Sequence, residues 1–148
     1  MMGGRRASRV RAMQALFYMD MNRNISSEMF ERYCNNFDSP QEILPFFTRL
    51  VKGVIAAKPE IDTIIGRFSS NWKMSRMSGV DRNIMRIAVY ELLFCDDIPP
   101  KVTINEAIDV GKKFGTKESG AFINGILDSV RIALGKEEIC SKTYIDGQ

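Results

Sequence analysis

Apolar residues recur every three or four positions along almost the whole chain, which is the spacing of one face of an α-helix. Strand-like alternation is scarce, and helix-ending residues fall at helix-length intervals, as in Asn22-Arg23-Asn24 and Asp96-Asp97-Ile98-Pro99-Pro100. A chain of 148 residues is long enough to bury a core. The pattern predicts an all-α fold of about seven helices in two packed helical subdomains.

Periodicity and turn residues set the predicted boundaries. A first helix is expected over about 6–21, and a central one from Val80 to about Cys95, which is apolar on most sides and therefore buried. A last helix is expected over about 118–135. Serines are expected to cap two helices, Ser26 or Ser27 for one and Ser78 for the central one.

Proline and a capping motif predict further boundaries. One helix is expected to begin near Pro45, and a separate one at Lys58-Pro59, because proline disrupts a helix interior. The sequence Thr103-Ile104-Asn105-Glu106 has the form of a capping box, which predicts a helix start there, and Gly115 fits its end.

Residues 1–135 are expected to form a single domain, with subdomains over about 5–70 and 78–135, joined by a connection over residues 71–79. Residues 136–148 are polar and are expected to form a flexible tail.

The residues that are absent exclude most chemistry. The chain has no histidine, which excludes histidine acid–base catalysis, nucleophile pairs and histidine metal sites. No glycine-rich phosphate loop occurs, and the adjacent Asp96 and Asp97 are interpreted as a solvated helix end. We therefore expect no enzyme activity, no cofactor and no metal.

The three cysteines are far apart and show no C-x-x-C spacing, which favours reduced thiols in a cytoplasm. No apolar run approaches the roughly eighteen residues that a membrane span needs, and the basic start leads into a mixed helix rather than a secretory signal. We expect a cytoplasmic protein without a membrane segment.

The strongest candidate site is an arginine-rich segment at the start. The net charge is only +3, but Arg5, Arg6, Arg9 and Arg11 lie in the first eighteen residues with no acid among them. Clustered arginines attract phosphate by charge and by bidentate geometry. The alternative interpretation is a solvated basic end.

Aromatic and amide side chains follow the arginines. Gln14, Phe17 and Tyr18 suit unpaired bases, which stack on rings and bond to amides, although Phe17 is also suited to a core. A second basic cluster consists of Lys112, Lys113 and Lys117. If the fold brings this cluster near the first helix, both would line one groove; otherwise it is a solvated helix end.

Two stretches resemble the N-utilisation substance B (NusB) family. Arg5-Arg6-Ala7-Ser8-Arg9 followed by Ala12-Met13-Gln14-Ala15-Leu16-Phe17 is similar to the family's arginine-rich start and A-x-Q-x-L-aromatic helix. The second stretch is more specific. It runs through Val80-Asp81-Arg82-Asn83-Ile84-Met85-Arg86-Ile87-Ala88-Val89-Tyr90-Glu91-Leu92-Leu93, Val102-Thr103-Ile104-Asn105-Glu106-Ala107 and Phe122-Ile123-Asn124-Gly125-Ile126-Leu127-Asp128.

This resemblance implies an all-α, non-catalytic RNA-binding protein. It implies binding of boxA, a short single-stranded element of ribosomal leader transcripts, together with ribosomal protein S ten (NusE). It further implies that the pair joins other Nus factors on elongating RNA polymerase and suppresses premature termination, chiefly in ribosomal RNA operons.

The resemblance also implies two surfaces. Carried over residue by residue, the RNA-binding surface is Arg5, Arg6, Arg9, Gln14, Phe17, Phe114, Glu118 and Phe122. The partner-binding surface is Arg82, Arg86, Tyr90, Glu91 and Asp97. Two positions depart from the family pattern: Phe17, often tyrosine, lacks a hydroxyl, and Glu118, commonly aspartate, has a longer reach to a base edge.

Two other functions stay open. One is the NusB-like domain that precedes the catalytic domain of some RNA cytosine methyltransferases, which would need a cofactor-binding domain and a nucleophilic cysteine beyond this chain. The other is a pure interaction module, such as a homodimer that hides its RNA surface.

Overall fold

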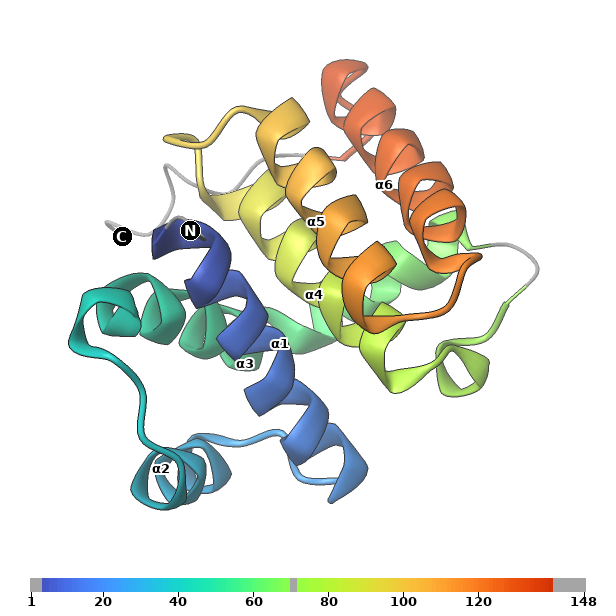
Figure 1. Cartoon of the computed structure of the whole chain (residues 1–148). Helices are drawn as coiled ribbons and strands as arrows, with labels where there is room; N and C mark the ends of the chain where they lie inside the picture. Colours follow the sequence, from blue (N-terminus) through green and yellow to red (C-terminus); the bar gives the residue numbers. More distant parts are fainter. Residues whose placement is uncertain (1–3, 70–71, 140–148) are drawn as a thin grey trace.

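The structure, a computed structural model, describes residues 4–69 and 72–139. This part of the chain is all helical and contains no strand, which confirms the predicted fold class (Figure 1). Its elements are α1 (Gly4–Met21), α2 (Ser27–Asn36), η1 (Gln41–Ile43), α3 (Leu44–Phe68), η2 (Met74–Arg76), α4 (Gly79–Phe94), α5 (Pro100–Phe114) and α6 (Ser119–Gly135), where η marks a short 3₁₀ helix.

The described residues form six α-helices rather than about seven, because α3 joins two helical segments across a kink. The kink lies at Ala57, whose backbone leaves the helical region (φ −110°, ψ 15°), directly before the helix start expected at Lys58-Pro59. Proline removes one backbone N–H and crowds the preceding turn, which explains why the helical path is interrupted there.

The helix caps show which local signals were sufficient. Ser26 caps α2 by accepting a hydrogen bond of 3.1 Å from the backbone N–H of Met29. Ser78 caps α4 by accepting one of 3.0 Å from the backbone N–H of Asp81. The capping box predicted at Thr103 is wrong, because α5 already begins at Pro100. Proline suits a first helical position, which needs no N–H partner. The Thr103 hydroxyl instead donates to Glu91 of α4.

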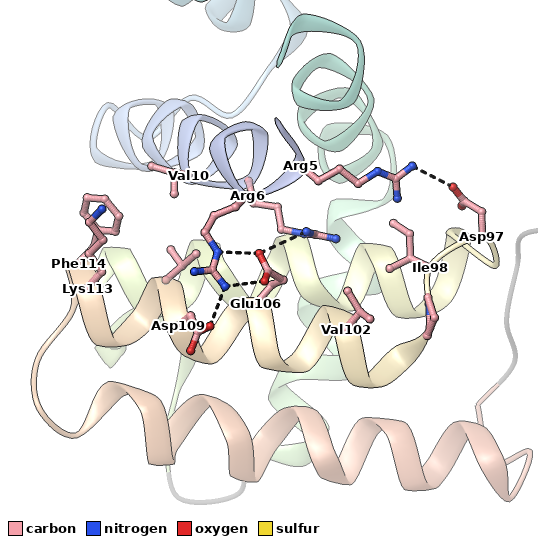
Figure 2. Close-up of a pocket in the computed structure, with 13 residues that line it drawn as sticks. Arg5, Arg6, Val10, Asp97, Ile98, Val102, Glu106, Asp109, Lys113 and Phe114 are labelled. Carbon is pink, nitrogen blue, oxygen red and sulfur yellow. Dashed lines mark hydrogen bonds and ion pairs between the residues drawn. The ribbon is translucent and has the colours of Figure 1, made fainter. Parts of the chain in front are cut away.

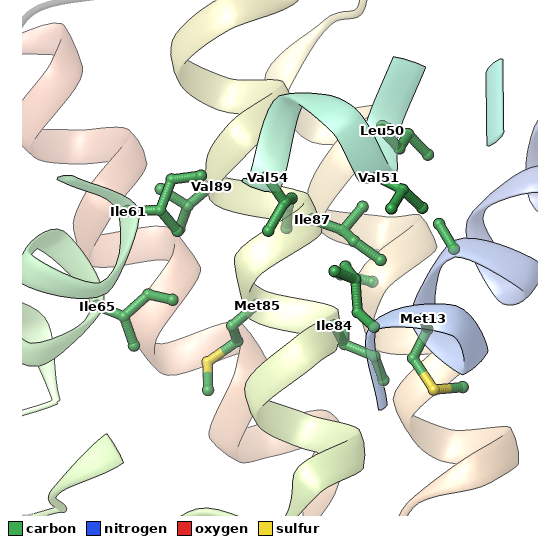
Figure 3. Packing of buried hydrophobic residues seen from close by; sticks show 14 of the residues in the cluster. Met13, Leu50, Val51, Val54, Ile61, Ile65, Ile84, Met85, Ile87 and Val89 are labelled. Atoms are coloured by element: carbon green, nitrogen blue, oxygen red, sulfur yellow. The ribbon is translucent and has the colours of Figure 1, made fainter. Parts of the chain in front are cut away.

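Helix α4 is the centre of the molecule, as predicted. It packs against α1 and α3 on one side and against α5 and α6 on the other (Figure 1). Its apolar residues Ile84, Met85, Ile87 and Val89 are buried among side chains of α1 and α3 such as Met13, Leu50, Val54 and Ile61 (Figure 3). Burying each such side chain stabilises the fold by about 1.5–3 kcal/mol. The division into two subdomains stays a prediction.

The predicted tail lies only partly within the described residues. Glu138 donates a backbone bond of 2.9 Å to Ala133 at the end of α6, and Ile139 packs, half-buried, against the core. Residues 140–148 lie outside the described residues. No helix of the described part is both long and apolar enough to cross a membrane.

Candidate nucleic-acid interface

A groove of about 640 Å³ lies between the first turns of α1 and one face of α5 (Figure 2). Helix α1 lines it with Arg5, Arg6 and Arg9, and the end of α5 contributes Lys113 and Phe114. Two basic segments that are about a hundred residues apart in the sequence therefore share one groove. Of the three lysines in the predicted second cluster, Lys113 lines this groove with the arginines, and Lys112 and Lys117 are not among its lining residues.

Arg6 is held inside this groove by two carboxylates. Its guanidinium donates to both oxygens of Glu106, at 2.9 and 2.6 Å, and to Asp109 at 2.7 Å (Figure 2). Hydrogen bonding to Glu106, then to Asp109, raises the Arg6 pKa above its usual value. The bond from Arg6 in turn lowers the pKa of Glu106. Arg6 is thus fully charged, but its field toward the groove is partly cancelled.

Arg9 is a core residue. Only 6% of its side chain is exposed, and its guanidinium makes a bidentate pair with Glu91, at 2.8 and 2.9 Å. Glu91 is 1% exposed and accepts a third bond, of 2.8 Å, from the Thr103 hydroxyl. This carboxylate of α4 therefore joins α1 to α5. Arg9 could reach a phosphate only by leaving it.

Arg5 is the most loosely held arginine of the segment. It is exposed, it lies 3.5 Å from Asp97, and its guanidinium covers the Phe46 ring at 4.6 Å. Asp97 has a stronger partner in Arg49, at 2.9 Å. The hydrogen bond from Arg49 lowers the pKa of Asp97 from 3.8 to about 2. Arg5 can therefore leave Asp97 without exposing an unpaired carboxylate.

The first helix is less positive in the folded protein than its sequence indicates. Arg11 differs from the others, since it donates to two neutral acceptors, the Tyr33 hydroxyl and the backbone carbonyl of Asp38. The acids that pair with the other three arginines come from positions 91–109. The sequence of the first eighteen residues therefore could not predict these ion pairs.

Four other predicted RNA residues, Gln14, Phe17, Glu118 and Phe122, do not line this groove. Gln14 and Phe17 are exposed on α1; the Phe17 ring, 37% exposed, lies against Gly79, where an added Cβ would come within 2.7 Å of it. Glu118 is exposed in the turn before α6, one helical turn from the half-buried Phe122, which donates its N–H to the Glu118 carbonyl. The partly exposed ring of Phe17 packs on Gly79, so this residue combines the two positions, core and surface, between which the sequence did not decide.

Phe114 closes one end of the groove, and Figure 2 shows its ring across from Val10 of α1. The Lys113 ammonium lies 5.6 Å from the centre of that ring. A cation above an aromatic face offers a phosphate and a base neighbouring contacts. This end of the groove combines both features expected of an interface for unpaired RNA.

Most of the predicted partner surface lies inside the fold. Arg82 and Arg86 are buried; both bond Asp20, at 2.8 and 3.0 Å, and Arg86 also bonds Asp62 at 2.8 Å. Burial raises the pKa of Asp20, but bonds from Arg82 and Asn83 outweigh this, so its pKa is lowered overall. These pairs fasten α4 to α1 and α3.

Tyr90 and Asp97 are the accessible members of that set. Tyr90 is half-buried and stacks on Phe94 at 5.2 Å, and burial raises its pKa. Asp97 is exposed at the edge of the groove. Together with the buried Glu91, the five residues do not form one continuous exposed patch, and their assignment to a partner stays a prediction.

Sequence analysis missed an exposed aromatic residue that contacts the predicted RNA residue Phe122. Trp72 lies in the connection between α3 and α4, 52% exposed, with its ring 6.1 Å from that of Phe122. The available signal was that the chain's single tryptophan stands in a polar connection rather than on an apolar helix face.

Comparison with known proteins places these features in a family. The sequence profile described as the NusB family matches residues 6–131. The chain belongs to the NusB family. It is 55% identical over 141 residues to the transcription antitermination protein NusB of Desulfatibacillum aliphaticivorans, covering 95% of this chain and 99% of that protein. The same protein of Myxococcus xanthus is 44% identical over 139 residues, covering 91% and 99%.

Solved structures agree with this assignment. T. maritima NusB superposes with a TM-score of 0.78 at 36% identity, covering 94% of this chain and all of that one. A solved complex, described as antitermination factors NusB and NusE with dsRNA, matches at 27% identity with a TM-score of 0.76, covering 90% and 99%. The family match over residues 6–131 includes most of α1 and the whole of α5, the two walls of the groove.

Proposed function

We propose that this chain is an RNA-binding transcription antitermination factor that binds boxA-type single-stranded RNA together with ribosomal protein S ten (NusE). In this proposal it joins the RNA polymerase antitermination complex with other Nus factors and suppresses premature termination, chiefly in ribosomal RNA operons. It acts in the cytoplasm and makes or breaks no bonds. The observation that carries the proposal is the groove in which the arginine segment of α1 meets Lys113 and Phe114.

The groove gives its arginines different roles. Arg5 and Arg6 contact phosphate, because Arg5 is exposed and the Nη1 group of Arg6 has no bonding partner among the described residues. Arg9 supports the site from the core through Glu91. A phosphate entering the groove meets Asp109, which repels it, so the acids reduce the affinity that the arginines provide.

Membership of the family supports the choice of RNA, and the relative solved with NusE and dsRNA supports the choice of partner. That relative is described with double-stranded RNA, whereas the exposed aromatic residues here favour unpaired bases. The test therefore compares single-stranded with double-stranded RNA.

The test is fluorescence anisotropy with labelled boxA-type single strands, scrambled strands and a boxA duplex, with and without NusE. We expect the boxA strand to bind most tightly, more so with NusE, and the logarithm of affinity to fall with that of salt by about 0.7 per phosphate contact. Tighter binding of the duplex would refute the single-strand assignment. Equal, weak and salt-insensitive binding of all RNAs would favour the pure interaction module. Analytical ultracentrifugation would then detect the homodimer that this alternative expects.

Two variants test the groove itself. Arg5→Ala combined with Arg6→Ala should weaken boxA binding about tenfold or more, since each phosphate contact adds to affinity. The matched variant Asp109→Asn should strengthen binding at low salt, because it removes a negative charge and leaves Arg6 paired with Glu106. If both variants bind like the unmodified protein, RNA does not use this groove.

A further inference from the structure

Trp72 presents a large apolar surface beside the predicted RNA residues. Its indole is about half exposed and packs edge-to-face on Phe122, with ring centres 6.1 Å apart and planes at 73°. In such a pair, each ring keeps at least one face clear of its partner. Trp72 therefore adjoins one predicted RNA residue, Phe122, near the start of α6.

The backbone of Trp72 is held in place before any ligand binds. Its N–H donates to the carbonyl of Ser69 at 2.8 Å, and the Ser69 hydroxyl donates to the Trp72 carbonyl at 3.1 Å. Ser69 itself is buried at the end of α3. A ring whose own backbone is already hydrogen-bonded loses little freedom when it makes a new contact, which favours binding.

The segment that begins at Trp72 reaches a second predicted RNA residue. It passes through η2 to Gly79, the first residue of α4, and the Phe17 ring of α1 lies on that glycine. The segment therefore has Phe122 at one end and Phe17 at the other. Figure 1 shows it entering α4 beside the carboxyl end of α1.

Charge decides which kind of ligand suits this surface. Lys73 and Arg76 follow Trp72, and Lys117 precedes Glu118; all three are exposed and have no ion-pair partner within residues 4–69 and 72–139. The groove arginines, in contrast, are all paired with acids. An aromatic ring that two cations without acid partners, Lys73 and Arg76, follow in the chain suits a nucleic acid better than an apolar protein surface.

We propose that Trp72 and Phe122 form a stacking platform for an unpaired base of the bound RNA, extending the interface beyond the groove. This rests on the proposed function. Base stacking on an aromatic side chain is tolerant of sequence, so the platform adds affinity rather than base choice.

The experiment exploits the fact that Trp72 is the only tryptophan. Single-stranded boxA-type RNA is titrated into the full chain while its intrinsic fluorescence and the anisotropy of the labelled RNA are recorded. We expect the indole emission to be quenched with the same midpoint as the anisotropy. Trp72→Ala should bind the RNA about tenfold more weakly, and the matched Trp72→Phe should retain most of the affinity because it keeps a ring. Thermal unfolding should be similar for all three proteins.

The outcomes separate this inference from the function on which it rests. If RNA binds but the emission is unchanged and Trp72→Ala binds equally well, the platform is refuted and the RNA function stands. If the alanine and phenylalanine variants lose affinity equally without quenching of the parent protein, Trp72 is merely structural and the platform is again refuted. Loss of NusE affinity alone in Trp72→Ala would assign the surface to protein. Absence of RNA binding in every readout, with NusE present, refutes both proposals.

Discussion

Replacing Arg9 by methionine removes one half of a charged pair that folding has taken out of water. Methionine fills a similar length of space but leaves Glu91, 1% exposed, with one hydrogen bond from Thr103 in place of three. Removing one member of a buried pair costs about 3–5 kcal/mol, most of which is the cost of the unpaired charge that remains. Domains of this size are stable by about 5–15 kcal/mol, so this single change removes a large share of the total.

The measurement is urea unfolding followed by circular dichroism. With a slope of about 2 kcal/mol per molar urea, we expect the midpoint of Arg9→Met to fall by about 2 M. The control is the double variant Arg9→Met/Glu91→Met, which replaces both charges with apolar groups and should recover most of the stability. A single variant within about 1 kcal/mol of the parent, or a double variant no better than the single, would refute the reasoning.

Three further predictions concern sites around the groove. Gly115→Ala should destabilise the protein by about 1–3 kcal/mol in urea unfolding, because its Cβ would lie 2.8 Å from the carbonyl oxygen of Gly111, a backbone atom that cannot rotate away. The Asp97 pKa of about 2 lies below its usual 3.8, so its pairing with Arg49 stabilises the fold above about pH 4 and is lost as the pH falls toward 2. Between pH 6 and pH 3, the free energy of unfolding of Asp97→Asn should therefore fall less than that of the parent protein. The difference between the two falls should be under about 1 kcal/mol because the pair is exposed, and equal falls would contradict this prediction. Cys95 is buried and its pKa is raised to about 11, so peptide mass spectrometry should find it unmodified by iodoacetamide at pH 8 unless denaturant is added.

Local signals were sufficient for most of the fold. The serine caps, the stop at Gly115 and the burial of α4 follow from nearest neighbours and helical periodicity, and all were predicted. The interruption of α3 at Ala57 also lies where Pro59 predicted a new helix. The error arose at Thr103, which meets a buried carboxylate instead of capping a helix.

The candidate site was harder to predict because its pairs are distant in sequence. Arg6 and Asp109 are 103 positions apart, and no local pattern states which carboxylate an arginine will meet. The inward position of Arg9 was the exception. It stands one turn before Met13 on the buried face of α1, and this spacing could have separated it from the exposed Arg5.

One carboxylate determines how the proposed complex must form. Glu91 bonds Arg9 on α1 and Thr103 on α5 at once, so the two walls of the groove cannot separate without stripping a buried charge of its partners. The protein side of the interface is accordingly a rigid template. The RNA therefore has to change its shape on binding. Its flexible backbone loses conformational entropy as it fits a groove of fixed width.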